Sequence, residues 1–213
     1  MDQEIDIINQ NTKAEKIKNF FLKNLKKIIT SVILVFLLIF AYFIILELKK
    51  RDNIKIAERY NQIIIKYDEN KKINIETELI AIINKKHTTY SPLALYFLLD
   101  NEIIKDLKKI NELFDLLINK TNTDEEIKNL LIYKKALVNS DQINENDLLN
   151  MLKPIINSDS IWKSHSLFLI AEFFYSKNER EKSKEFFSQI LNLEKSNLNI
   201  KSEAQKKLNR DFK

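Results

Sequence analysis

The 213-residue sequence contains no glycine, no cysteine and only two prolines, Pro92 and Pro154. Without glycine, the chain cannot form the glycine-rich loops that bind phosphates in nucleotide-binding proteins. Without cysteine, it can form no disulfide, thiolate nucleophile or cysteine-based metal site. Sheet proteins use glycine and proline at their turns, so the scarcity of both predicts an all-α chain.

Histidine is also scarce, and His87 and His165 are the only two. Neither has another histidine within a helical turn, as a zinc site on one helix requires, so we predict no metal and no other cofactor. The serines beside His165 lie in a predicted helix, where adjacent side chains point in different directions, and we expect His165 to be a packing residue. The acidic run at 124–126 stands where acids favour the start of a helix. The sequence therefore predicts a protein that is not an enzyme.

One long apolar run is present, from Ile28 to Leu46, and it contains no charged residue. At about 1.5 Å per residue, about 19 residues of helix span about 28 Å, close to the roughly 30 Å hydrocarbon core of a bilayer. A core helix would keep a polar stripe, and a cleavable signal peptide would carry a small-x-small cleavage site after its apolar region. The run shows neither, so it predicts an uncleaved transmembrane signal anchor.

Positive charges flank the run on both sides, with six lysines in residues 13–27 and five lysines or arginines in residues 47–61. This bias favours a cytoplasmic N-terminus and a C-terminal region on the opposite side of the membrane. The basic segment is either a short amphipathic helix on an anionic membrane surface or the simple flank of an anchor. Its apolar residues recur at helical spacing: Ile17, Phe20, Phe21, Leu25 and Ile28. We expect no nucleic-acid binding, because these lysines lie beside the bilayer and outside any recognisable module.

After residue 47 the sequence predicts a series of helices separated by polar turns. We expect helices at 56–66, at 75–84, from an N-cap at Ser91 with Pro92 in the first turn, at 103–118, from a cap at Thr123 or Asp124, from a start at Asn146 or Asp147, at 164–175, at 180–191, and around Ala204 and Leu208. Pro154 is expected to disturb the last turn of its helix.

The last clear pair of helices shows a repeat-like pattern. A hydrophobic-small pair, an aromatic, a turn residue, a small residue and a second aromatic follow one another: Ile170-Ala171, Phe174, Asn178, Ser183 and Phe187. This spacing resembles the tetratricopeptide repeat, although asparagine replaces the turn glycine, serine replaces the usual alanine and the closing proline is missing. Asparagine is the best substitute for glycine in a left-handed turn. We therefore expect the aromatic patches at 173–175 and 186–187 to pack as core.

Two earlier segments repeat the pattern less clearly, which gives three predicted hairpins: 91–118, 125–157 and 161–192. The predicted organisation is a basic tail (1–27), a span (28–46), linking helices (47–90) and a tetratricopeptide-like right-handed solenoid (91–213). In such a solenoid the first helix of each hairpin lines a concave face, so the candidate partner-binding residues are Tyr96, Tyr133, Lys134, Phe168 and Glu172. Trp162 is expected in the core, and the register of the middle hairpin stays open because Lys134 and Lys135 stand where apolar residues are preferred.

The order of a short tail, one span and a helical-repeat domain resembles the YfgM-type family of ancillary SecYEG translocon subunits. The resemblance is carried by "EIDIINQNTKAEKIKNFF", "AERYNQI", "TYSPLALYFL" and "LIAEFFYSKNEREKSKEFFSQIL". It implies a single-pass inner-membrane protein whose periplasmic domain binds the Sec translocon, a periplasmic chaperone or secreted clients, and no small molecule. The main alternative is a scaffold for another envelope assembly, in cell division or outer-membrane biogenesis. A hydrolase that depends on His165 and a self-associating membrane-shaping protein are more distant alternatives.

Overall fold

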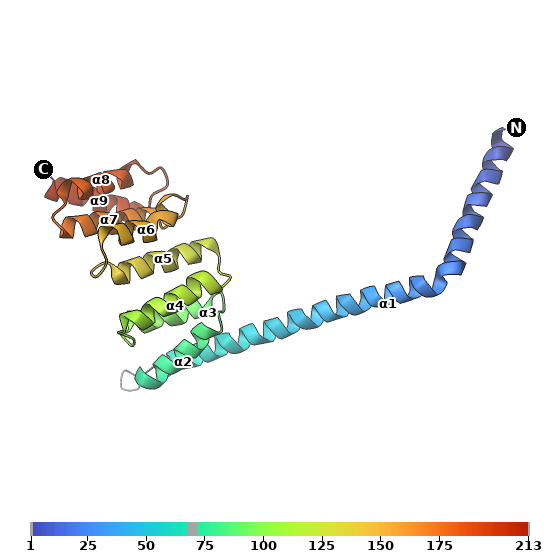
Figure 1. Cartoon of the computed structure of the whole chain (residues 1–213), viewed down its shortest axis with the longest axis horizontal. Helices are drawn as coiled ribbons and strands as arrows, with labels where there is room; N and C mark the ends of the chain where they lie inside the picture. The colour runs from blue at the N-terminus through green and yellow to red at the C-terminus, as the bar shows by residue number, and fades with distance from the viewer. Residues whose placement is uncertain (1, 68–71, 213) are drawn as a thin grey trace. The chain divides into compact units, whose positions relative to one another are not determined.

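The computed structural model describes residues 2–67 and 72–212, and all regular elements within these ranges are α-helices (Figure 1). Side chains are described from Glu15 onward except at positions 17, 21, 28, 72 and 73, so Ile17, Phe21 and Ile28 of the predicted amphipathic segment lie outside the description. The helices are α1 (Asp2–Ile65), α2 (Lys72–Asn84), α3 (Tyr90–Asp100), α4 (Leu107–Lys120), α5 (Glu125–Asn139), α6 (Glu145–Ile156), α7 (Lys163–Ser176), α8 (Arg180–Asn192) and α9 (Leu198–Asp211). The all-α class is confirmed.

The chain divides into two units, residues 1–55 and residues 56–213. The first unit is formed by α1, which contains a stretch long and apolar enough to cross a membrane. Among the described side chains of the predicted span, residues 29–46, none is buried, as Leu34 and Phe36 illustrate. A core helix would be covered by other elements, so length, composition and exposure together agree with the predicted span near the N-terminus.

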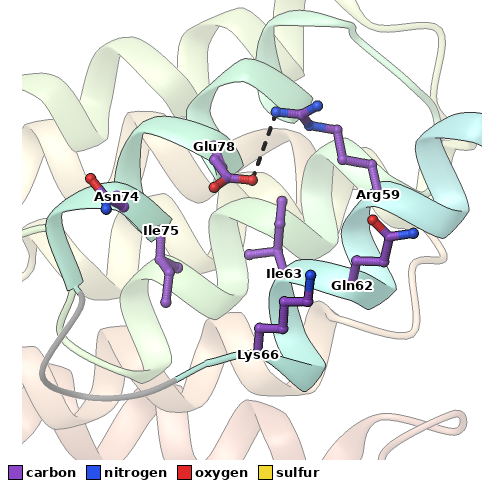
Figure 2. Close-up of a pocket in the computed structure, with 7 residues that line it drawn as sticks. All are labelled: Arg59, Gln62, Ile63, Lys66, Asn74, Ile75 and Glu78. Atoms are coloured by element: carbon purple, nitrogen blue, oxygen red, sulfur yellow. Dashed lines mark ion pairs between the residues drawn. The ribbon is translucent and has the colours of Figure 1, made fainter.

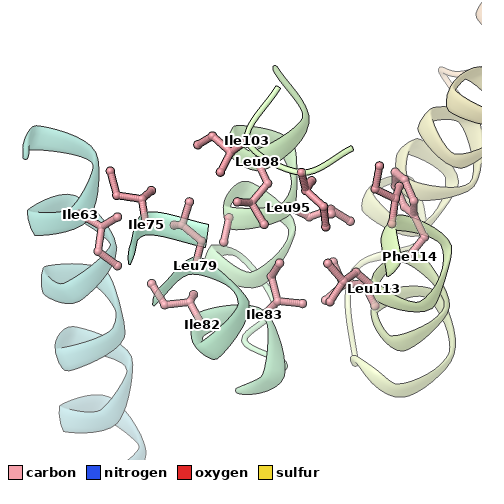
Figure 3. Close-up of a cluster of buried hydrophobic side chains, with 14 of the residues drawn as sticks. Ile63, Ile75, Leu79, Ile82, Ile83, Leu95, Leu98, Ile103, Leu113 and Phe114 are labelled. Atoms are coloured by element: carbon pink, nitrogen blue, oxygen red, sulfur yellow. The ribbon is translucent and has the colours of Figure 1, made fainter. Parts of the chain in front are cut away.

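The second unit begins inside the last turns of α1. Ile63 of α1 is buried against α2, and Figure 3 shows it facing Ile75 and Leu79. Ile56 and Tyr60 pack on the same cluster. From Ile56 onward, the segment expected to link the span to a domain starting at residue 91 is thus part of the second unit, because the end of α1 and α2 both bury an apolar face in its first core cluster.

The remaining helices bury overlapping apolar clusters in chain order. The first cluster joins the end of α1 to α2, α3, α4 and Leu131 of α5. The second joins α5, α6 and α7, and the third joins α7, α8 and α9. α7 and α8 pack closely, and the rings of Phe174 and Phe186 stack with centroids 5.6 Å apart. Asn178 adopts a φ of 61° in the turn between them. The expected aromatic core and left-handed asparagine are both confirmed.

Most helix positions follow the prediction, but α3 begins earlier than expected. Ser91 was expected as its N-cap and Pro92 as its first residue, whereas the helix begins at Tyr90 after Thr89. The Ser91 hydroxyl is buried and donates to the carbonyl of Ile82 instead of capping α3. The Ser91 hydroxyl is not needed as a cap, because the His87 side chain accepts hydrogen bonds from the amides of Thr89 and Tyr90 at the start of α3.

The helix expected from Ile103 begins only at Leu107. Glu102 adopts a left-handed φ of 50° after α3, and Asp106 caps α4 by accepting hydrogen bonds from the amides of Lys108 and Lys109. Ile103 and Ile104 are buried although they lie in the connection between α3 and α4. Their burial explains why the apolar pattern predicted a helix that begins before Leu107.

The middle pair of helices also differs in detail. Asp124 caps α5, as one of the two expected residues, but α6 is capped by Asn144 and not by Asn146 or Asp147. The Asn144 side chain accepts from the Asp147 amide, so the acid lies inside the first turn, where the helix dipole favours it. Pro154 was expected to disturb the last turn, yet α6 stays helical to Ile156.

Candidate protein-binding face

The five candidate residues lie on alternate helices: Tyr96 on α3, Tyr133 and Lys134 on α5, and Phe168 and Glu172 on α7. All five are half-buried, and each contacts a residue of another helix or its cap. Three of these contacts join alternate helices, α3 to α5, α5 to the cap of α7, and α7 to α9. We call this surface the alternate-helix row.

The first contact in the row joins α3 to α5. The ammonium of Lys134 lies 4.7 Å from the ring centroid of Tyr96 and 3.7 Å from a carboxylate oxygen of Asp100. Burial, and secondarily the charge of Asp100, raises the pKa of the Tyr96 hydroxyl well above its usual range, so Tyr96 is neutral at all physiological pH values. The Tyr96 hydroxyl is buried and has no hydrogen-bond partner among the described residues.

Lys134 and Lys135, which made the register of the middle hairpin uncertain in the sequence, both form ion pairs with other helices. Lys135 is only 16% exposed and its ammonium lies 2.7 Å from Asp115 of α4. Lys134 points to α3 as described above. Two adjacent lysines on α5 therefore bridge to the two preceding helices, which explains how charged residues fit at packed positions.

The second contact joins α5 to the start of α7. The rings of Tyr133 and Trp162 stack at 6.0 Å between centroids, and the His165 ring lies 5.9 Å from Tyr133 and 5.1 Å from Trp162. Burial lowers the pKa of His165 and raises the pKa of Tyr133, so both rings are neutral near pH 7. Trp162 was expected in the core, and it is half-buried and packs against the second core cluster.

The last contacts of the row surround α7. The Lys207 ammonium of α9 lies 2.7 Å from a carboxylate oxygen of Glu172 and 5.3 Å from the centroid of Tyr175. Phe168 contacts Phe187 of α8 edge-on, with centroids 5.3 Å apart. Both charged candidates, Lys134 and Glu172, are thus paired within the chain.

The structure adds exposed apolar residues that the sequence analysis missed. Leu93 is 38% exposed and lies one turn before Tyr96, while Leu137 is 46% exposed and lies one turn after Tyr133. Ile161, directly before Trp162, is 66% exposed. No sequence signal separates these residues from core leucines and isoleucines, because their exposure depends on how far neighbouring helices reach.

One pocket lies between α1 and α2, outside the row (Figure 2). It has a volume of about 280 Å³ and is lined by Arg59, Gln62, Ile63, Lys66, Asn74, Ile75 and Glu78. An exposed ion pair of 3.7 Å between Arg59 and Glu78 crosses it. The lining has no nucleophile paired with a general base, and none of the described parts of the chain has a cluster of metal-binding side chains.

Comparison with known proteins gives no match for this chain, whether with family models, curated proteins or solved structures.

Proposed function

We propose that this protein is a membrane-anchored interaction module that binds other proteins through the alternate-helix row. The observation that carries the proposal is that Leu93 and Leu137 are exposed one helical turn from Tyr96 and Tyr133, and that exposed Ile161 directly precedes Trp162. Exposed apolar residues gathered beside aromatic rings are typical of protein-binding surfaces.

The partner that best fits the row is an uncharged, apolar segment of polypeptide. Lys134 is paired with Asp100 and Glu172 with Lys207, so the row offers no free charge from its candidate residues to a charged partner. Aromatic rings and aliphatic side chains can still bury apolar groups of a partner. The mechanism is tethering, in which the anchor raises the local concentration of the row near membrane-bound partners.

The same proposal includes a tetratricopeptide-like right-handed solenoid. Successive helices contact each other from α2 to α9, and α5 contacts α7 as α7 contacts α9. The Ser183 hydroxyl donates to the carbonyl of Ala171 at 2.8 Å, which places α8 close to α7 at the small-residue position of the repeat. These contacts support a stack of hairpins whose first helices share one side.

The specific assignment we propose is an ancillary subunit of the Sec translocon, with its helical unit in the periplasm beside chaperones or secreted clients. It is supported by the order of tail, span and helical unit and by the charge bias around the span. A scaffold for cell division or outer-membrane biogenesis would use the same anchor and row, so the partner distinguishes the two.

Site-specific photo-crosslinking in intact membranes tests the proposal. A benzoylphenylalanine at Leu93 or Leu137 is expected to capture a translocon subunit, a periplasmic chaperone or a secreted client. The same group at Lys184, an exposed residue of α8 outside the row, is the matched control. Capture of division or outer-membrane assembly proteins would favour the alternative scaffold, and no capture above the Lys184 control would refute the row as a binding face.

A further inference from the structure

The turn between α2 and α3 is closed by a histidine that must be neutral. The Nδ1 atom of His87 lies 3.1 Å from the backbone nitrogens of both Thr89 and Tyr90. A backbone N–H can only donate, so Nδ1 accepts and carries no proton. Since Thr89 makes no side-chain capping bond, the His87 ring acts as the cap of α3.

Ser91 completes the same turn without any titrating group. Its buried hydroxyl accepts from the amide of His87 at 2.8 Å and donates to the carbonyl of Ile82 at 2.8 Å. The turn also holds Lys86 at a left-handed φ of 54°. Its conformation therefore depends on two side chains, and only one of them can change charge between pH 5 and pH 8.

The cap is connected to the helix that carries the apolar anchor. The His87 ring lies 5.1 Å from the ring of Tyr90, which in turn lies 5.6 Å from the ring of Tyr60 on α1. Tyr60 and Tyr90 both pack on the first core cluster. A change in the position of the first turn of α3 would therefore alter the packing of Tyr90 against Tyr60 in the last turns of α1.

We propose that His87 is an acid-sensitive latch, whose protonation releases the start of α3 and loosens the packing of Tyr90 on Tyr60. The latch does not depend on the proposed binding function. It would make the junction between the end of α1 and the following helices weaker in acid than at neutral pH.

The chemistry of the cap gives the direction of the effect. A proton on Nδ1 would face two N–H donors and place a positive charge at the positive end of the helix dipole. The groups facing the ring are Tyr90 of α3 and, behind it, Tyr60 of α1. Lys85 and Lys86 precede it in the turn after α2. Among the described residues, His87 has no carboxylate ion-pair partner that would favour its charged form.

The sign of the pH dependence follows from the pKa. Burial lowers the pKa of His87 below its ordinary value of 6.5. Between 6.5 and the lower folded pKa, the unfolded turn binds more protons than the folded turn, so the turn becomes less stable as the pH falls. For each unit by which the folded pKa lies below 6.5, the equilibrium for opening rises about tenfold in acid.

Hydrogen exchange on the full chain in lipid nanodiscs tests the latch. Exchange of the amides at residues 89–91, 93 and 94, corrected for the intrinsic effect of pH, is expected to rise as the pH falls from 7.5 to 5.0. His87→Asn should abolish this rise, because an asparagine oxygen can accept the same bonds at every pH. Ser91→Ala should raise exchange about equally at both pH values.

His165→Asn is the matched control, since it removes the other histidine and should leave the acid response of α3 intact. NMR titration of the two imidazoles should give His87 a pKa below 6.5. A His87 pKa at or above 6.5, or an acid response that survives His87→Asn, would overturn the proposal.

Discussion

At the scale of single residues, a chain without glycine must place other residues in left-handed turns. Lys86, Glu102 and Asn178 have φ values of 54°, 50° and 61°. A left-handed conformation costs a residue with a Cβ about 1–2 kcal/mol, and asparagine tolerates it better than glutamate. The Glu102 side chain is exposed, and its ion pair with Lys105 is a surface contact that contributes little.

We therefore predict that Glu102→Gly raises the free energy of unfolding by about 0.5–1 kcal/mol, because relief of the strain exceeds the entropy that glycine adds to the unfolded chain. Denaturant unfolding of the full chain in detergent measures the change. Asn178→Gly is the control and should have a smaller effect. A less stable Glu102→Gly variant would show that the turn at the end of α3 is not strained.

At the scale of helices, the contact between α7 and α8 depends on a small residue at Ser183. This side chain is fully buried and donates to the carbonyl of Ala171. We predict that Ser183→Ala costs at most about 1.5 kcal/mol, the net value of one hydrogen bond. Ser183→Leu should cost about 1–3 kcal/mol or more, because no space exists for the larger side chain.

Thermal unfolding of the two Ser183 variants gives the comparison, with Lys184→Leu as the exposed control on the same helix. Equal stability of Ser183→Ala and Ser183→Leu would mean that α8 does not approach α7 closely and would weaken the tetratricopeptide-like proposal. A severe loss of stability in Lys184→Leu would show that even an exposed leucine on α8 is harmful.

The ends of the helices indicate how much of the fold could be predicted from the sequence. Helices with regular apolar spacing and clear polar turns, such as α7 and α8, were placed within one residue at their ends. The errors lie where a tertiary contact replaces a local signal. His87 caps α3 from outside the helix, and Ile103 is buried in a connection. Exposure of Leu93 and Leu137 depends on the placement of neighbouring helices, so no local pattern could identify these residues.

At the scale of the whole molecule, the position of the unit boundary decides which fragment can fold. The first core cluster buries Ile63 of α1 and Ile75, Leu79 and Ile83 of α2 against α3 and α4 (Figure 3). A fragment beginning at residue 91 would lose both helices and expose the apolar faces of α3 and α4. A fragment of residues 56–213 keeps the entire cluster.

We predict that residues 56–213 form a soluble, helical fragment with one cooperative thermal transition. Residues 91–213 are expected either to aggregate or to unfold without cooperativity in α3 and α4. Circular dichroism, analytical ultracentrifugation and hydrogen exchange of α3 and α4 distinguish the two fragments. Burying an apolar side chain contributes about 1.5–3 kcal/mol, so loss of the α1 and α2 contacts removes most of the stability of a typical domain. An equally stable fragment 91–213 would place the boundary where the sequence pattern first suggested it and make α1 and α2 a separate linker.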